Sequence, residues 1–244
     1  MSNDPIVTFS CASWAIRKHA PVLPASEFYP EEWKHLKNNE VKPFENFDGE
    51  TIKSVKLCPV VNDYIGAGYV IPAWCDIEIS FNNDEMLLKY SDPYAQVLTH
   101  LPEQIEPLLQ KKFKVRMDVK LDCPWAIHTK PGYSLMWLPM LYHDKNYQAL
   151  PGIIDTDLIL NRNPINIMLK EPVTTLIKMG EPLVQIIPFK REVVTAVSRE
   201  YTERDEKRRM SILELIKLTR YGWRQFMREK KSYKLSRQDL DLPS

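Results

Sequence analysis

Residues 112–121 read KFKVRMDVKL, and this stretch decides the fold class of the chain. Polar and apolar side chains alternate over its whole length, which is the period of a β-strand with one buried face and one wet face. Short strand patterns continue from there to residue 189, and turn residues separate them. The expected strands are 125–128, 134–138, 153–159, 166–169, 174–177 and 183–189. Short strands at this spacing favour a sandwich or barrel-like β domain over residues 111–191.

Upstream of residue 111 the patterns are mixed. Residues 77–81 alternate cleanly, and residues 84–90 suit the second strand of a hairpin. We expect two further strands and a helix, in which Ser26 caps a first turn and Pro30 suits a helical start. These elements are strands at 6–12 and 51–58, a helix at 25–38 and a helical turn at 102–110. Residues 1–110 are therefore expected to form an α+β part that packs on the rest of the chain.

Beyond Pro188 the pattern changes to that of a helix. Residues 193–231 are nearly free of glycine and proline, and apolar residues recur at helical spacing from Ile212 to Phe226. Between Arg204 and Arg237 there are twelve Lys or Arg residues against four Asp or Glu residues. We predict a basic amphipathic helix over 192–235. Its expected partner contacts are Arg208, Arg209, Arg220, Arg224 and Arg228. The alternative is a helix that packs on the β domain and keeps these charges in solvent.

Composition narrows the classes of function. The 244 residues are 44% hydrophobic and 27% charged with a net charge of +1, which is typical of a globular protein and predicts no partner from overall charge. No apolar run approaches the roughly 18 residues that span a bilayer, and the first residues do not resemble a signal peptide. The four cysteines and five histidines have no metal-ligand spacing, so neither a metal nor a cofactor is expected. A cytoplasmic protein with free thiols is the expectation.

Two segments carry a recognisable motif. Residues 150–157 read LPGIIDTD, and residues 177–187 read IKMGEPLVQII. Together they resemble the G-x-I-D-x-D-Y-R-G and I-x-x-G-x-x-x-x-Q-x-I segments of the dUTPase and dCTP deaminase superfamily, whose domains have the β-clip fold. The segment PGYSLMWLP, residues 131–139, is similar to the strand that leads into the P-R-S motif of that superfamily. This resemblance covers residues 112–189 and implies a mainly β, β-clip-like domain that is followed here by a long C-terminal helix.

The same resemblance implies a nucleotide site. Asp155 occupies the position of the aspartate that activates water, and Asp157 and Gln185 would place substrate or water, with Mg²⁺ as the metal. Several other motif positions differ, because Leu158 replaces the tyrosine that stacks on the base, and Met140 and Leu141 replace the arginine and serine of P-R-S. The alternative interpretation is that Asp155 and Asp157 shape a turn between strands.

A longer resemblance runs through nearly the whole chain. The segments 24–28, 56–59, 68–76, 124–134, 150–157 and 180–192 look like an uncharacterised family of tailed phages, notably those of marine cyanobacteria, and of some bacteria. That resemblance implies an accessory or virion-associated protein in the host cytoplasm or the virion, and it implies no activity.

Two hypotheses of function therefore stand side by side. The first is binding of another protein or of itself, without catalysis. The second is a nucleotide-binding enzyme that hydrolyses or deaminates deoxynucleoside triphosphates, with Asp155 and Asp157 as catalytic residues. Aromatic side chains near the turns either pack in the core and at its rim or line a ligand pocket or partner surface. The expected residues of such a pocket are Tyr133, Ser134, Trp137 and Gln185. Nucleic acid and membrane are not expected partners, because the sequence contains no motif for either.

Overall fold

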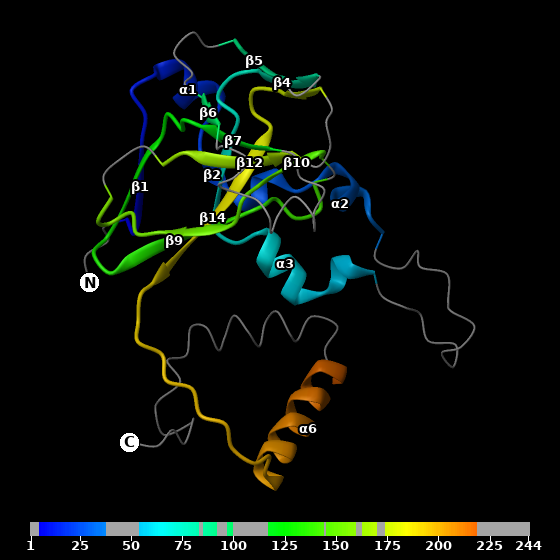
Figure 1. Cartoon of the computed structure of the whole chain (residues 1–244). Coiled ribbons are helices and arrows are strands. Elements are labelled where there is room, and N and C mark those ends of the chain that lie inside the picture. The colour runs from blue at the N-terminus through cyan, green and yellow to red at the C-terminus, as the bar shows by residue number, and fades with distance from the viewer. Residues whose placement is uncertain are drawn as a thin grey trace.

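The computed structural model describes residues 5–37, 54–82, 85–91, 97–99, 117–143, 145–159, 163–169 and 174–218. In this part of the chain the protein is mainly β with few helices (Figure 1). The strands are β1 (Val7–Ser10), β2 (Leu23–Pro24), β3 (Tyr69–Pro72), β4 (Ile77–Asn82), β5 (Glu85–Tyr90), β6 (Val97–Thr99), β7 (Met117–Leu121), β8 (Ala126–Thr129), β9 (Tyr133–Leu138), β10 (Tyr147–Ala149), β11 (Gly152–Ile154), β12 (Ile165–Leu169), β13 (Thr175–Ile177) and β14 (Pro182–Lys190). The helices are α1 (Trp14–His19), α2 (Glu31–His35), α3 (Pro59–Ile65) and α6 (Glu203–Leu218), with short 3-10 turns η1 (Ala25–Phe28) and η2 (Val55–Leu57).

The strands pair in antiparallel ladders that join distant parts of the sequence. The largest sheet has the order β11-β9-β14-β3-β2, and a second sheet has the order β10-β12-β7-β6. The hairpin of β4 and β5 pairs with β13, and β1 pairs with β8. Strands that precede residue 100 therefore share sheets with strands that follow residue 126, so the two parts of the chain form common layers (Figure 1).

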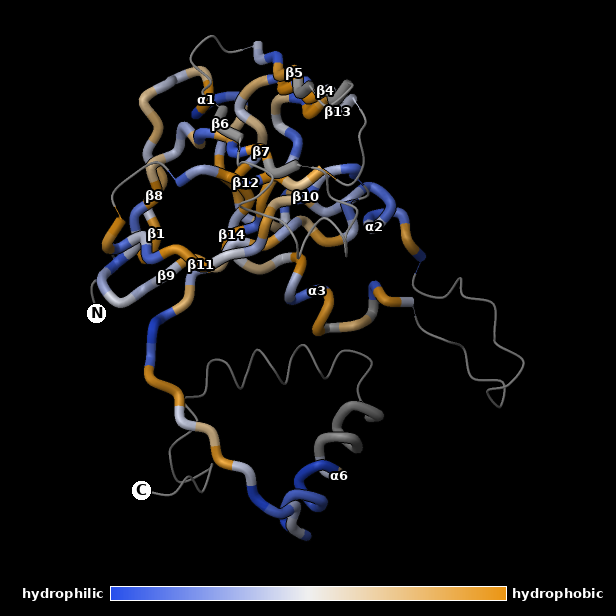
Figure 2. Tube along the Cα trace, viewed as in Figure 1, coloured by the Kyte–Doolittle hydropathy of each residue, from blue (hydrophilic) through white to orange (hydrophobic). Residues whose placement is uncertain are grey.

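One hydrophobic core lies between these layers. Its members alternate along the strands, as the period of two requires. On β14, for example, Val184 and Ile186 face the core, together with Leu135 and Trp137 of the neighbouring β9. Figure 2 shows the apolar stretches of the tube gathered within the body that these strands form.

A glycine allows the chain to pass close to β14. Gly68 has a φ of +69°, and a Cβ atom at this position would lie 2.1 Å from the Ile186 carbonyl oxygen. Only glycine combines this backbone conformation with such a close approach. Gly68 therefore fixes where β3 begins and how it lies against β14.

Two expectations for the N-terminal part are wrong. The helix expected over 25–38 is instead the 3-10 turn η1 followed by α2, because Tyr29 and Pro30 are extended, with ψ of 133° and 146°. A residue before proline is driven out of the helical region, so the two turns cannot merge. The strand expected over 51–58 is also wrong. The structure describes this range from residue 54 onward, and there residues 55–57 form η2. Helix α3 follows it and begins at Pro59, the position where proline suits a helix best.

The predicted C-terminal helix begins later than expected. Residues 192–202 are not helical, and α6 starts at Glu203. Thr202 caps it, because its hydroxyl accepts from the Asp205 N–H at 3.4 Å and its own N–H donates to Asp205 Oδ2 at 2.9 Å. This is a capping box, which sets a helix start strongly. Ahead of it, the β-branched residues Val193, Val194 and Thr195 favour an extended chain. Residues 219–235 of the predicted helix lie outside the described residues.

Residues 192–201 form an extended segment that leaves the body at the end of β14, and we call this segment the arm. Figure 1 shows it running away from the sheets to α6, which stands apart from them. Among the described residues, no helix is long and apolar enough to cross a membrane.

Candidate functional site

The two motif aspartates lie in a tight turn directly after β11. The Leu158 and Ile159 N–H groups both donate to the Asp155 carbonyl at 3.0 Å, which closes the turn. Thr156 between them is fully buried, and its hydroxyl lies 2.9 Å from the Thr129 hydroxyl on β8. This buried pair fixes the turn against β8 and directs the carboxylates on either side of it away from the core.

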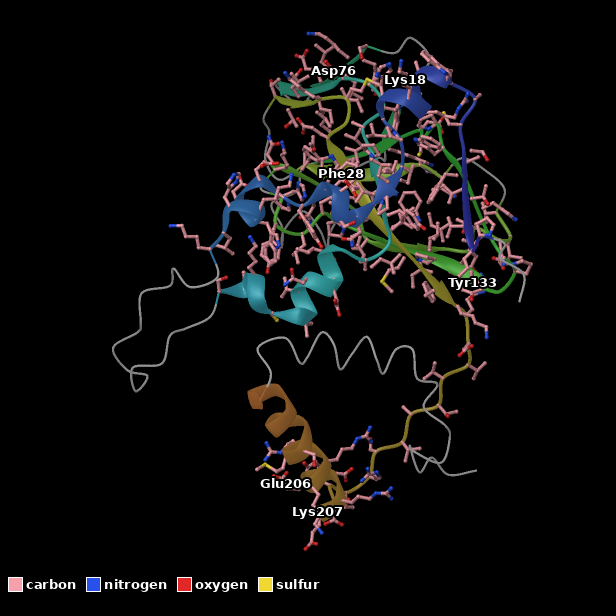
Figure 3. The ribbon with its side chains drawn as sticks, turned by 180° about the vertical axis from the view of Figure 1, so that it is seen from behind. Lys18, Phe28, Asp76, Tyr133, Glu206 and Lys207 are labelled. Carbon is pink, nitrogen blue, oxygen red and sulfur yellow. The ribbon has the colours of Figure 1, made fainter. Side chains whose placement is uncertain are left out.

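Both carboxylates meet one arginine, at the point where the arm begins. Arg191 Nη1 lies 2.8 Å from Asp157 Oδ1, 2.9 Å from Ser134 Oγ and 3.2 Å from Asp155 Oδ1, and Nη2 also contacts Asp157. Ser134 Oγ donates to Asp155 Oδ1 at 2.6 Å. We call Ser134, Asp155, Asp157 and Arg191 the Arg191 clamp. Figure 3 shows its place, since the labelled Tyr133 marks the end of β9 beside which the chain leaves the body.

Hydrogen bonds of the backbone link the same segments. The Arg191 N–H donates to the Gly132 carbonyl at 2.8 Å, and the Gly132 N–H donates to Asp157 Oδ2 at 2.8 Å. Gly132 has a φ of +82°, the left-handed conformation that glycine adopts readily in the turn before β9. The clamp therefore ties three segments together, namely the turn before β9, the turn after β11 and the first residue past β14.

The two carboxylates differ in their surroundings. The Asp157 side chain is 4% exposed, whereas the Asp155 side chain is 42% exposed. The hydrogen bond from Arg191, aided by the one from Gly132, lowers the pKa of Asp157 to about 2. The same contact raises the pKa of Arg191. Asp157 is thus a charged anchor with low proton affinity, and Asp155 is the carboxylate that solvent can reach.

The four expected ligand residues do not form one pocket. Ser134 belongs to the clamp, and Tyr133 lies beside it, with its carbonyl accepting from Arg191 Nη1 at 3.2 Å. The Trp137 ring, in contrast, is buried in the core. Gln185 lies on the opposite face of the sheet, because Trp137 pairs with Ile186 and successive side chains alternate. Its amide donates to the carbonyls of Tyr64 and Ala67 at 2.8 and 2.7 Å, so it holds the end of α3.

Comparison with known proteins gives a distant structural likeness. No protein-family model matches the chain, and no curated protein matches it. A mutant dUTPase from phage phi11 of S. aureus, solved to show the coordination of a structural Mg(II) ion, is similar with a TM-score of 0.32 and 13% identity. The likeness covers 69% of this chain and 95% of that one. The resemblance to a tailed-phage family stays a prediction.

No cluster of three or more His, Cys, Asp or Glu side chains suited to a metal ion occurs among the described residues. In the clamp, the guanidinium of Arg191 contacts both carboxylates of the motif. The cation that these carboxylates meet in the structure is therefore a side chain of the chain itself. None of the four cysteines forms a disulfide.

The sequence analysis missed Arg191. It directly follows β14, outside both motifs of the dUTPase resemblance, and only the pairing of β14 with β9 and of β9 with β11 brings it to the aspartates. In the sequence, Arg191 is marked only by its position as a cation directly after β14. That strand is separated in the sheet by β9 from β11, the strand that leads to Asp155. Of the expected partner-contact residues, Arg208 and Arg209 are exposed on α6, and Arg209 pairs with Glu206. Arg220, Arg224 and Arg228 lie outside the described residues.

Proposed function

We propose that this protein acts by binding protein, and in particular by self-assembly, without catalysis. The observation that carries the proposal is the exposure of the arm. Val193, Val194 and Val197 are 98%, 85% and 79% exposed. Figure 2 shows apolar stretches on this segment, outside the body. Fully burying a valine side chain is worth roughly 1.5–3 kcal/mol, so an arm with three exposed valines gains stability from a partner surface.

The Arg191 clamp supports the same proposal. It holds the first residue past β14 by side-chain and backbone bonds, so the arm leaves the body from a fixed point. A fixed root lowers the entropy that the arm loses when it binds. In this proposal Asp155, Asp157 and Ser134 serve as an anchor for the arm rather than as a catalytic set.

The resemblance to the phage family supports a proposal for where the protein acts. We propose an accessory or virion-associated protein that works in the host cytoplasm or in the virion. Its domain over 111–191 is β-clip-like. Arg208 and Arg209 on the exposed surface of α6 are proposed as further contacts for an acidic protein partner.

The test is the molar mass in solution. We expect the wild-type chain to show a defined oligomer by size-exclusion chromatography with light scattering, and Val193→Asp/Val197→Asp to run as a monomer. Val60→Asp is the matched control, because Val60 is also exposed, at 71%, but lies on α3 away from the arm. A monomeric wild-type chain that also captures no protein partner through the arm would contradict the proposal.

The nucleotide-binding enzyme remains the second candidate. The observation in its favour is the 42% exposure of Asp155, which leaves one motif carboxylate open to solvent. A ligand that binds only the folded chain must raise the melting temperature. We expect deoxynucleoside triphosphates, with or without Mg²⁺, to leave the melting temperature unchanged. A rise that disappears in Asp155→Ala would instead favour the enzyme.

A further inference from the structure

The loop between β9 and β10 contains a strained residue. Tyr142 has a φ of +63°, and among the described residues it is the one residue other than glycine with a positive φ. A bulky side chain adopts this left-handed conformation only where its surroundings hold it there, because its Cβ atom crowds the backbone. The strain at Tyr142 is therefore released when the contacts of the loop break.

Two contacts hold this loop against the N-terminal part of the chain. The Tyr142 ring lies 5.2 Å from the Trp33 ring of α2, between ring centroids. The neighbouring His143 donates from Nε2 to the Phe28 carbonyl at 3.0 Å, since a carbonyl can only accept. Phe28, labelled in Figure 3, is the last residue of η1. We call Phe28, Trp33, Tyr142 and His143 the His143 latch.

The latch covers an apolar side chain of a short helix. Trp33 is 6% exposed, whereas Tyr142, which packs on it, is 46% exposed. Helix α2 has five residues, and a helix shorter than about 12 residues is not stable without packing. The position of α2 therefore depends on contacts such as this one. When Tyr142 leaves, water and solutes gain access to the Trp33 ring.

A proton on His143 opposes the closed latch. Burial lowers the pKa of His143, because the charged imidazole loses hydration there, and the like charge of Lys145 acts in the same direction. Lys145 is held near by an ion pair with Glu181, at 3.1 Å. The hydrogen bond to the Phe28 carbonyl and the carboxylate of Glu32 on α2 raise the pKa, but by less. In the described part of the chain, Lys145 and Glu32 are the charged side chains that influence this ring.

The direction of the pH dependence follows from these surroundings. The closed latch keeps His143 neutral, whereas a hydrated imidazole takes up its proton near the ordinary value of about 6.5. Lowering the pH below about 6.5 therefore favours the open latch, which binds the proton more tightly. The strain at Tyr142 favours opening as well, so only the Trp33 contact and the hydrogen bond to Phe28 hold the loop.

We propose that the His143 latch is a pH-sensitive switch, which opens when His143 takes up a proton and thereby uncovers Trp33. The strained Tyr142, its contact with Trp33 and the half-buried imidazole beside it together make this loop an element with two states. The proposal goes beyond the proposed self-assembly, because the latch contains no residue of the arm or of the Arg191 clamp. Either proposal can fail without the other.

The first test follows Trp33 by fluorescence with acrylamide as the quencher. Each protein is compared with its Trp33→Phe counterpart, so the difference reports Trp33. We expect quenching of this signal to rise at least about twofold between about pH 7.5 and about pH 5. His143→Gln keeps an amide donor for the Phe28 carbonyl and takes up no proton in this range, so its signal should not change. His128→Gln, at an exposed histidine on β8, is the matched control and should behave like the wild type. A step that persists in His143→Gln, or that is absent from the wild type, overturns the proposal.

The second test removes the ring that closes the latch. Tyr142→Gly accepts the positive φ without strain and loses only the contact with Trp33, so Trp33 should be quenched at neutral pH as strongly as in the acidic wild type. Tyr142→Phe keeps a ring and should keep the pH step. The imidazole signal of His143 in nuclear magnetic resonance should titrate with the same midpoint as the quenching. An unchanged far-ultraviolet circular dichroism spectrum separates opening of the latch from unfolding of the body. A closed Tyr142→Gly, a different midpoint or a lost spectrum at about pH 5 overturns the proposal.

Discussion

The buried carboxylate of Asp157 makes the stability of the protein depend on pH. Its pKa is lowered from 3.8 to about 2, mainly by the hydrogen bond from Arg191. A group whose pKa is lower in the folded chain stabilises that chain fully above its unfolded pKa, and this contribution is lost as the pH falls through the folded pKa. The window is therefore between about pH 4 and pH 2.

We predict that Asp157→Asn lowers the melting temperature at neutral pH, because the substitution removes the charge that Arg191 pairs with. The difference between variant and wild type should shrink as the pH falls through about 2, because the wild-type carboxylate then takes up its proton as well. Thermal unfolding at a series of pH values measures this difference. Glu203→Gln, at an exposed carboxylate, is the control. A difference that stays constant over the whole range would mean that the ion pair does not stabilise the clamp.

At single residues, sequence patterns identified the carboxylates but not what they contact. The motif around Asp155 and Asp157 was visible because it is local, and the interpretation of both as turn residues agrees with the turn that Asp155 closes. Arg191 was not visible, because its role depends on the register of three strands. Gln185 was expected to bind a ligand, but its amide donates hydrogen bonds to backbone carbonyls at the end of α3. Polar side chains inside a sheet often satisfy the backbone, and no sequence pattern marks this use.

Among the elements, the attachment of α3 to the large sheet gives a second prediction. Gln185 is buried on β14 and donates to the carbonyls of Tyr64 and Ala67, at the end of α3. Gln185→Leu keeps most of the volume and removes both hydrogen bonds, which leaves buried acceptors without these donors. We expect a loss of about 2 kcal/mol in the free energy of unfolding, measured by denaturant titration. Gln148→Leu, at a half-buried glutamine on β10, should cost clearly less. Equal losses would show that the bonds from Gln185 do not hold α3.

The strands were easier to predict than the helices. Alternation located β4 and β7, because the two faces of a half-buried strand carry different side chains. Short strand patterns between turn residues located β9 and β14. The short strand β10 and helix α3 were missed, since three or seven residues are too few for a period to be clear. The helix start at 192 was wrong, because the absence of glycine and proline was taken as a helix signal. The β-branched residues and the TERD capping box at 202–205 mark the true start.

For the whole molecule, the arrangement of body, arm and α6 connects these features. The body has one core that both halves of the chain share, and it does not need the arm to bury its apolar residues. The arm carries its valines outside this core. Sequence patterns could not distinguish the exposed valines of the arm from the apolar residues of the core, because a valine in an extended segment has the same sequence pattern whether it is exposed or buried. Only the folded body shows which apolar residues have no place within the chain.

Self-assembly of this kind makes the stability of the whole molecule depend on its concentration. Association stabilises the folded chain by mass action, since the unfolded chain does not bind. We predict that the melting temperature of the wild type rises with protein concentration, while that of Val193→Asp/Val197→Asp does not change. The contact is apolar, so sulfate should strengthen the association and sodium chloride should not break it. Differential scanning calorimetry over a hundredfold range of concentration, with and without salt, tests both points. A melting temperature independent of concentration in the wild type would contradict self-assembly. An assembly that dissociates in salt would place the contact on the charged surface of α6 and not on the arm.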